Sequence, residues 1–159
     1  MSEIRVGTGF DAHALVDGVP LVLGGVRVDY PRGLEGHSDG DVLAHALTDA
    51  ILGAAGMADI GALFPSGDAK YDGADSVELL REAWRQVHEA GWQLVNADVV
   101  LIGEEPWLAP HRDAMRARLS EAVGVEPERV AVRATTTDRL GFAGRGEGLA
   151  ATAVALLRR

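Results

Sequence analysis

The sequence predicts an α+β fold in which helices pack on one face of a single mixed β-sheet. Apolar residues spaced three and four positions apart are typical of amphipathic helices, and short β-branched segments punctuated by glycine indicate strands. The predicted elements follow the order βββααβαββ, which mixes hairpins with crossovers and therefore suits one sheet with helices on one side. The chain has 159 residues and no linker, low-complexity tract or repeat, so we expect a single domain spanning residues 1–159.

Short strands and one helix are expected in the first third of the chain. The strand segments are Ile4–Gly9, Pro20–Leu23 and Val26–Tyr30. The helix spans Asp39–Ala55, and Ser38 or Asp39 is its expected N-cap, because these side chains accept hydrogen bonds from free N–H groups of a first helical turn.

The middle of the chain contains the strongest helix signal. Val77, Leu80, Trp84 and Val87 form one apolar stripe of a helix over Asp75–Ala90, which Asp75 caps and Gly91 ends. The next segments are a strand at Leu94–Gly103, a helix at Pro110–Val123 and a strand at Arg129–Thr137. The alanines of Leu149–Leu157 favour a helix, but its alternating apolar residues after a glycine-rich turn favour a strand, which we expect.

Composition excludes several classes of function. The net charge of −9 and a pI near 4.9 make nucleic acid and anionic membranes poor partners, because both are polyanions. The chain has no cysteine, so a metal site must use His, Asp or Glu. No apolar run reaches membrane-spanning length, and the N-terminus enters a strand pattern with no targeting segment, so we expect a cytoplasmic location.

Three dispersed residues form a candidate metal site. Asp11 and His13 lie two positions apart in an extended segment, so their side chains point to the same face. His45 adds a second imidazole, and two imidazoles with one carboxylate suit zinc or iron and leave a coordination position open for catalysis. The structural alternative is that Asp11 only orients a histidine and that His45 is a half-buried histidine of the core.

The segment before the first predicted helix is a candidate anion site. His37 and Ser38 lie at the helix entrance, where free backbone N–H groups favour phosphate. Asp41 precedes His45 by four residues, which predicts that both lie on one helix face. The alternative is that the aspartates only interact with the helix dipole.

Three later segments carry further candidates. Thr135, Thr136 and Thr137 offer hydroxyl donors for phosphate, and Asp138 offers an oxygen ligand for a magnesium-type ion; the alternative is a strand that enters a turn. The glycine-rich run 141–148 allows close backbone approach, and its Arg145 is a candidate cation for an anion, although a flexible hairpin fits equally well. The segment 59–68 is an acceptor-rich loop suited to a ribose or a metal; the alternative is a loop with no binding role.

Four motifs carry a family resemblance. They are GFDAH, HSDGDVLAHALTDA, DIGALFP and ATTTDRLGFAGRGEG, in this order. With these motifs the chain resembles the 2-C-methyl-D-erythritol 2,4-cyclodiphosphate synthases of the non-mevalonate isoprenoid pathway over essentially its whole length. The resemblance implies a mixed four-stranded sheet with helices in each subunit, a homotrimer with active sites between neighbouring subunits, and a small-molecule cytidyl diphosphate substrate.

The resemblance also implies a role for each matching residue. Asp11, His13 and His45 correspond to Zn²⁺ ligands, Asp138 to a ligand of a second ion (Mg²⁺ or Mn²⁺), and His37 and Thr136 to catalytic residues that stabilise the transition state. The implied substrate-binding residues, including a cytosine pocket contributed by the neighbouring subunit at Gly103–Ala109, are Ser38, Asp59, Ile60, Gly61, Phe64, Pro65, Asp68, Gly103, Pro106, Trp107, Leu108, Ala109, Thr135, Thr137, Phe142 and Arg145.

Three segments depart from the family pattern, at four positions. Asp138 replaces the usual Glu and is one methylene shorter, Ser66 and Gly67 replace Asp and Thr in the loop after the first helix, and Trp107 replaces Lys in the cytosine loop. The expected reaction is intramolecular attack of the 2-phosphate of 4-diphosphocytidyl-2-C-methyl-D-erythritol 2-phosphate on its β-phosphate, which yields the cyclic diphosphate and CMP.

Two other functions remain open at this point. A non-catalytic trimer that binds nucleotides or isoprenoid diphosphates is consistent with the changes at Trp107 and Asp138. A non-haem Fe(II) oxygenase also uses two histidines and one carboxylate, but it usually requires a barrel of many strands.

Overall fold

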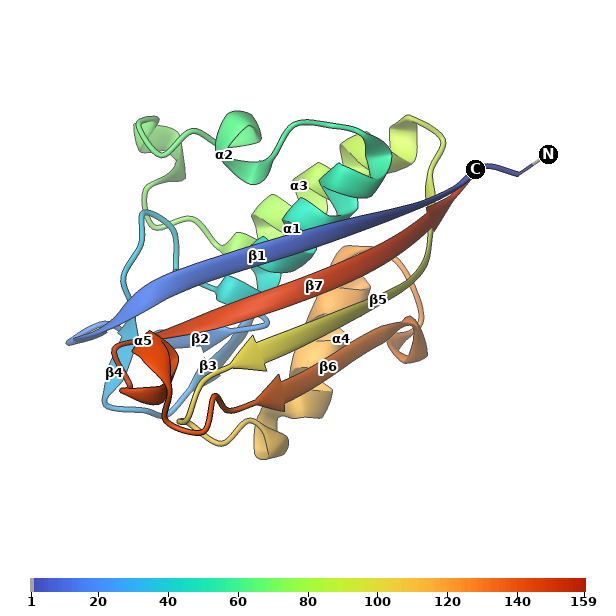
Figure 1. The fold of residues 1–159 in the computed structure, drawn as a ribbon. Coiled ribbons are helices and arrows are strands. Elements are labelled where there is room, and N and C mark those ends of the chain that lie inside the picture. Colours follow the sequence, from blue (N-terminus) through green and yellow to red (C-terminus); the bar gives the residue numbers. More distant parts are fainter. Residues whose placement is uncertain (1) are drawn as a thin grey trace.

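The computed structural model describes residues 2–159 (Figure 1). Its strands are β1 (Ile4–Asp17), β2 (Leu21–Leu23), β3 (Val26–Val28), β4 (Arg32–Leu34), β5 (Gln93–Ile102), β6 (Val130–Thr135) and β7 (Gly148–Arg158). Its α-helices are α1 (Val42–Ala55), α2 (Ile60–Leu63), α3 (Ser76–Glu89), α4 (Arg112–Ala122) and α5 (Gly141–Gly144), and single 3₁₀ turns lie at Ala69–Tyr71, Ala109–His111 and Pro127–Arg129.

One mixed sheet dominates the structure, with the strand order β4-β1-β7-β5-β6. β5 and β6 are parallel, whereas β1 pairs antiparallel with β4 and β7, and β7 pairs antiparallel with β5. The predicted α+β class, the mixed sheet and the C-terminal strand are confirmed. The three-residue strand β4 makes five strands where four were implied.

The expectation of a single sheet is wrong for two short strands. β2 and β3 form a separate antiparallel pair. Gly24 and Gly25 connect them with φ values of 57° and 73°, and this tight turn pairs the two strands with each other. Leu21 and Leu23 are then buried in the common core, so the pair closes one end of the domain.

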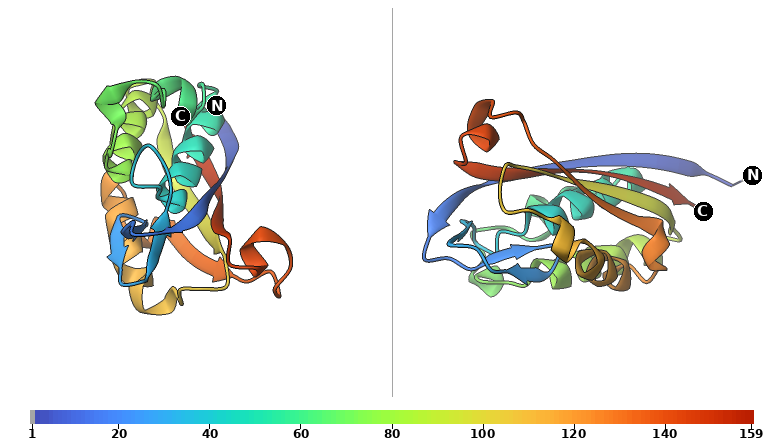
Figure 2. Two further views of the ribbon diagram at one scale, coloured as in Figure 1. Left: turned by 90° about the vertical axis from the view of Figure 1, so that its left-hand side faces the viewer. Right: turned by 90° about the horizontal axis from the view of Figure 1, so that it is seen from below.

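Helices α1, α3 and α4 cover one face of the sheet, as predicted (Figure 2). α1 lies against β1 and β7, α3 packs beside α1, and α4 covers β6. Within residues 2–159 the opposite face carries only the short helix α5, near one end of the sheet (Figures 1 and 2). This open face is apolar: Ile4, Val6 and Phe10 of β1 are 63%, 63% and 59% exposed, and Val154 of β7 is 45% exposed.

Glycines of β1 determine how closely α1 approaches the sheet. A Cβ atom on Gly7 would overlap the carbonyl oxygen of Ala50, and one on Gly9 would overlap that of Ala46. The helix face that meets β1 is therefore built from alanines, and the strand face from residues without side chains. This close contact brings the beginning of α1 next to the middle of β1.

The boundaries of several elements differ from the predictions. β1 continues to Asp17 rather than ending at Gly9, because it pairs with β7 along almost its whole length. α1 begins at Val42, and Asp41 rather than Ser38 or Asp39 is its N-cap, since the Asp41 carboxylate accepts a hydrogen bond from Ala44 N. Asp75 caps α3 as predicted.

In residues 2–159, no helix combines the length and the apolar character needed to cross a bilayer.

We predict that Gly9→Ala destabilises the domain by about 3 kcal/mol, because the added methyl group forces α1 away from β1. Gly67→Ala is the matched control, since a Cβ atom there would meet nothing within 4 Å. Urea denaturation of both variants measures the free energy of unfolding. Equal stability of the two variants would show that the helix–strand contact is looser than the structure indicates.

Candidate functional site

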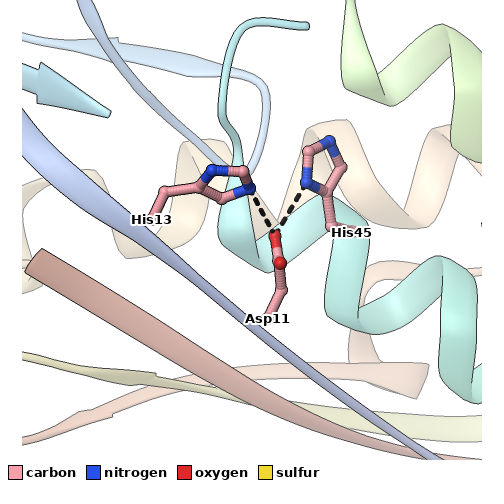
Figure 3. A group of neighbouring side chains, drawn as sticks. All are labelled: Asp11, His13 and His45. Carbon is pink, nitrogen blue, oxygen red and sulfur yellow. Dashed lines mark hydrogen bonds and ion pairs between the residues drawn. The ribbon is translucent and has the colours of Figure 1, made fainter. Parts of the chain in front are cut away.

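Two histidines and one aspartate meet between β1 and α1 (Figure 3). Asp11 Oδ2 lies 3.0 Å from His13 Nε2 and 2.8 Å from His45 Nδ1. One ligand atom from each residue lies within 4.8 Å of the other two. The same-face prediction for Asp11 and His13 is confirmed, and α1 brings His45 to them across 32 residues of sequence.

The outer nitrogen of each imidazole is also hydrogen-bonded. His13 Nδ1 lies 2.6 Å from the backbone carbonyl of Glu35, to which its N–H donates. His45 Nε2 lies 2.8 Å from Ser76 Oγ and 3.1 Å from Ser38 Oγ. These bonds direct His13 Nε2 and His45 Nδ1 toward Asp11, which is the arrangement that a metal ion held by all three residues requires.

The electrostatics of the cluster favour an ionised Asp11. Burial raises the pKa of Asp11, but hydrogen bonds with His13 and His45 and their charges outweigh it and lower this pKa to about 2. The pKa of His13 is raised, chiefly by its hydrogen bond to Asp11 and against the effect of burial. The site therefore offers an ionised carboxylate beside two imidazole nitrogens, a donor set that fits zinc and leaves one position open.

A pocket of about 220 Å³ opens beside these three residues. His37, Ser38, Ile60, Gly61 and Phe64 are among the residues that line it. The His37 side chain is 67% exposed, and its Nδ1 lies 3.8 Å from Asp72 Oδ1, so this imidazole is accessible to a ligand.

The carboxylates of Asp59 and Asp68, in the loop after α1, accept hydrogen bonds from backbone N–H groups of the same loop. Asp59 caps α2 by accepting a hydrogen bond from Ala62 N, and Asp68 accepts one from Lys70 N. Neither residue lines the pocket, and neither does Pro65. Their arrangement shapes the rim on which Phe64 lies, and Phe64 packs edge-on against Tyr71.

The remaining predicted residues do not line the pocket beside the metal cluster. A second pocket of about 380 Å³ is lined by Glu104, Glu105, Arg139 and Arg145 among others, and no residue lines both pockets. Gly103 N donates to the carbonyl of Thr135, which joins the 103–109 loop to the threonine segment. α5, which contains Phe142, lies on the sheet face opposite the main helices (Figure 2).

The 103–109 loop, the segment Thr135–Asp138, Phe142 and Arg145 are called the second group below. Their side chains differ in how accessible they are to a ligand. Trp107 is 78% exposed, whereas Leu108 is buried in the core. Thr137 Oγ1 donates to the carbonyl of Leu140, and Asp138 is exposed with a φ of 51°. Arg145 Nε lies 2.7 Å from Glu147 Oε1, so this guanidinium already has a carboxylate partner.

The remaining members of the second group are polar or small and surround the same turn. Thr135 Oγ1 donates to the carbonyl of Thr136, and Thr136 Oγ1 accepts a hydrogen bond from Asp138 N. Ala109 begins the 3₁₀ turn Ala109–His111, and Pro106 follows a cis peptide bond. Most of the hydroxyl groups here are thus engaged in forming the turn.

Asp41 does not join the metal cluster. It is fully buried, and its carboxylate accepts hydrogen bonds from Gly24 N, Gly25 N and Ala44 N. The expectation that Asp41 and His45 share a helix face is wrong, because the helix begins only after Asp41. Asp41 instead ties the glycine turn between β2 and β3 to the start of α1.

Sequence reasoning missed several residues around the pocket. Tyr71 and Leu79 line it, and Ser76 and the Glu35 carbonyl hold the two imidazoles. Ser76 directly follows a predicted helix cap, which is the one local sign that it lies at the end of an element. Nothing in its sequence neighbourhood indicates contact with His45.

The fold and the site together define a class of protein. It is an α+β domain with an open mixed sheet, and a cluster of two histidines and one aspartate that could hold a metal ion lies between its first strand and first helix. The model of the YgbB family matches residues 4–158. The chain belongs to this family, and the resemblance seen in its motifs is confirmed.

Relatives and solved structures support the assignment over the whole chain. A 2-C-methyl-D-erythritol 2,4-cyclodiphosphate synthase of Moorella thermoacetica is 58% identical over 154 residues, covering 97% of this chain and 94% of the relative. The enzyme of the same name from Rubrobacter xylanophilus is 57% identical over 162 residues, covering 100% and 98% of the two chains.

Two solved structures have the same fold. The bifunctional IspDF of Campylobacter jejuni matches with a TM-score of 0.95 and 45% identity; the match covers 99% of this chain and 43% of that longer one. A 2C-methyl-D-erythritol-2,4-cyclodiphosphate synthase with bound CDP matches with a TM-score of 0.88 and 41% identity, covering 96% and 99%.

We predict that Asp11→Asn destabilises the metal-free protein by about 2 kcal/mol near pH 5 and by less on either side. The lowered pKa of Asp11 gives stability that is present above its ordinary value near 4 and is lost as pH falls toward 2. The raised pKa of His13 gives stability that is present below 6.5 and is lost as pH rises through its folded value.

Urea unfolding of wild type and variant in chelator, from pH 3 to pH 9, measures this difference. A difference that stays constant with pH would mean that the Asp11–imidazole pairs do not contribute to folding.

Proposed function

We infer that this chain is a phosphorus–oxygen lyase that converts 4-diphosphocytidyl-2-C-methyl-D-erythritol 2-phosphate into 2-C-methyl-D-erythritol 2,4-cyclodiphosphate and CMP, a step of isoprenoid biosynthesis. The observation that carries this inference is the convergence of Asp11, His13 and His45 beside a pocket that also contains His37 and Ser38. Relatives that are 54–58% identical over nearly their full lengths have this activity as their name.

The reaction requires little acid–base chemistry. An oxygen of the 2-phosphate forms a bond to the β-phosphorus, and the bond from that phosphorus to the oxygen of CMP breaks. The nucleophile is already an anion, so the barrier comes from repulsion between phosphates and from the entropy of bringing the two ends of the substrate together.

We propose Zn²⁺ at Asp11, His13 and His45, because two imidazoles and a carboxylate suit this ion. We propose Mg²⁺ or Mn²⁺ at Asp138, because a carboxylate oxygen with phosphate oxygens suits harder cations. When bound, such ions supply positive charge that offsets the repulsion between phosphates. Asp11 is held ionised, and the two histidines are oriented by hydrogen bonds, so this chain prepares the first ligand set before binding.

The surrounding side chains are proposed to orient the substrate. His37 presents an accessible imidazole N–H, and Thr136 presents a hydroxyl, so both can donate to phosphoryl oxygens in the transition state. Ser38 and the loop that contains Ile60, Gly61 and Phe64 lie where they can contact the sugar-like portion. Asp59, Pro65 and Asp68 hold that loop in place.

The other predicted residues are proposed to bind the cytidyl end on the neighbouring subunit. They are Gly103, Pro106, Trp107, Leu108, Ala109, Thr135, Thr137, Phe142 and Arg145. Leu108 takes part through its backbone, since its side chain is buried in the core.

We propose that three copies of the chain assemble and complete each other's sites. Within one chain none of the proposed cytidyl-binding residues lines the pocket beside the metal cluster, and Arg145 lines a separate pocket that shares no residue with it. The open face of the sheet exposes Ile4, Val6, Phe10 and Val154, an apolar surface of the kind that protein interfaces bury. We propose that assembly through this face places one copy's metal cluster near another copy's cytidyl-binding residues.

The oxygenase alternative is not supported by the fold. It predicts a closed barrel, whereas the strands of residues 2–159 form an open mixed sheet and a separate two-stranded pair. The alternative of a non-catalytic binding protein is tested by the first experiment below.

We predict that the purified protein with Zn²⁺ and Mg²⁺ releases one CMP for each cyclic diphosphate formed, as followed by ³¹P NMR, and that chelation abolishes turnover. His37→Ala should lower kcat about 10²- to 10³-fold, the range typical for loss of a transition-state donor. His88→Ala is the control, because His88 lies on α3, does not line the pocket beside the metal cluster, and has its imidazole hydrogen-bonded to the Trp92 carbonyl. A linear diphosphate product, or unchanged kcat in His37→Ala, would contradict the proposal.

We predict that two inactive variants restore activity to each other when co-expressed. His45→Ala removes the metal group and Asp138→Ala removes a residue of the second group, so a mixed trimer contains some sites with both groups intact. Activity should return to a fraction of the wild-type value, as measured on co-purified, differently tagged chains. If each chain formed a complete site alone, every site in the mixture would carry a defect and no activity would return.

A further inference from the structure

A network of part-buried hydrogen bonds continues from His45 away from the metal cluster. His45 Nε2 lies 2.8 Å from Ser76 Oγ, and Ser76 Oγ makes a short hydrogen bond to Asp39 Oδ1. Ser76 N also donates to Asp39 Oδ2 at 3.1 Å. Ser76 has no exposed surface, so water does not compete for its hydroxyl group.

The number of hydrogens that each group in this hydrogen-bond network can donate determines which nitrogen of His45 carries a proton. A serine hydroxyl has one hydrogen, and an ionised carboxylate only accepts. The charge-assisted bond to Asp39 is shorter than the 3.2 Å contact between Ser76 Oγ and Ser38 Oγ, so the hydrogen of Ser76 goes to Asp39. Ser76 Oγ must then accept from His45, which places a hydrogen on Nε2.

This assignment leaves a lone pair on His45 Nδ1, directed at the Asp11 carboxylate 2.8 Å away. This lone pair and the carboxylate repel each other unless a cation, either an added proton or a metal ion, lies between them. The arrangement behind His45 therefore prepares the site for a metal ion rather than for a neutral hydrogen bond to Asp11.

Further hydrogen bonds join the two segments that carry Asp39 and Ser76. Asp39 N donates to the carbonyl of Ala74, and Gly73 N donates to the carbonyl of His37. The segment that carries His37 and Ser38 is thus bound to the beginning of α3 at several points. A shift of Ser76 would move the ligand His45 and this segment together.

We propose that Ser76 and Asp39 are positioning residues, which hold His45 with its proton on Nε2 and thereby set the affinity and geometry of the metal site. The proposal rests on the proposed function in one respect: it requires that Asp11, His13 and His45 bind a metal ion. The partner of His13 is the backbone carbonyl of Glu35, so His45 is the ligand whose orientation depends on side chains.

Ser76→Ala isolates this role, because it removes only the hydroxyl group. The helix cap of α3 is retained, since Asp75 and not Ser76 accepts from Val77 N, and the backbone N–H of residue 76 still donates to Asp39. Ser120→Ala is the matched control: Ser120 is equally buried, and its hydroxyl donates to the Ala117 carbonyl on α4. Asp39→Asn is a second variant that removes the charge while keeping the shape.

The experiment measures Zn²⁺ affinity by competition with a chromophoric chelator, and the visible absorption spectrum of the Co²⁺-loaded proteins. We expect Ser76→Ala to bind Zn²⁺ about 10- to 100-fold more weakly and to show an altered Co²⁺ spectrum, whereas Ser120→Ala matches wild type. Asp39→Asn should weaken binding in the same direction. Imidazole ¹⁵N shifts should show His45 Nε2 protonated in zinc-loaded wild type.

Wild-type affinity and spectrum in both Ser76→Ala and Asp39→Asn would overturn the proposal, as would absence of metal binding by the wild type. A Ser120→Ala variant that loses as much affinity as Ser76→Ala would also overturn it, since the effect would then be general loss of packing. Failure of the proposed function is distinct: the wild type would bind metal with the expected dependence on Ser76 but release no CMP.

Discussion

The site depends on how closely α1 approaches β1. Gly7 and Gly9 allow the backbone of Ala46 and Ala50 to come against the strand, and no larger side chain fits there. The next helix-facing residues along β1 are Asp11 and His13, which lie where α1 begins and where space for side chains returns. A stripe of small residues thus sets the distance at which His45 meets the strand, and the three ligands converge because the backbones pack so tightly.

Local spacing predicted the parts of the site that lie within one element. The two-residue period of a strand placed Asp11 and His13 on one face, and the apolar stripe of α3 predicted that helix to within a residue of each end. Spacing failed for Asp41, because a four-residue interval has meaning only inside a helix. Whether Asp39 or Asp41 caps α1 is decided by the Gly24–Gly25 turn, which donates two further hydrogen bonds to Asp41 from a distant segment.

The hydrogen bonds that hold the two histidines could not be predicted from local sequence patterns, because they join segments that are far apart in the sequence. Ser76 lies 31 residues from His45, and the carbonyl of Glu35 lies 22 residues from His13, so only tertiary packing brings them together. The family resemblance named the residues of the second group, but within one chain none of them lines the pocket beside the metal cluster. A list of site residues along a sequence does not show which residues share a pocket within one chain.

The distribution of charge in the chain indicates which groups can offset the negative charge of a bound diphosphate. The chain has a net charge of −9, so positive charge must be local. The N-terminus of α1 is occupied by the Asp41 carboxylate, and the guanidinium of Arg145 is paired with Glu147. Both candidate sources are therefore already neutralised within the chain. The cluster of Asp11, His13 and His45 brings two neutral donors and one negative charge, so a bound divalent cation leaves it with a net positive charge. On this argument the metal ions are the main source of attraction for the substrate, and the protein contributes chiefly by holding their ligands in position.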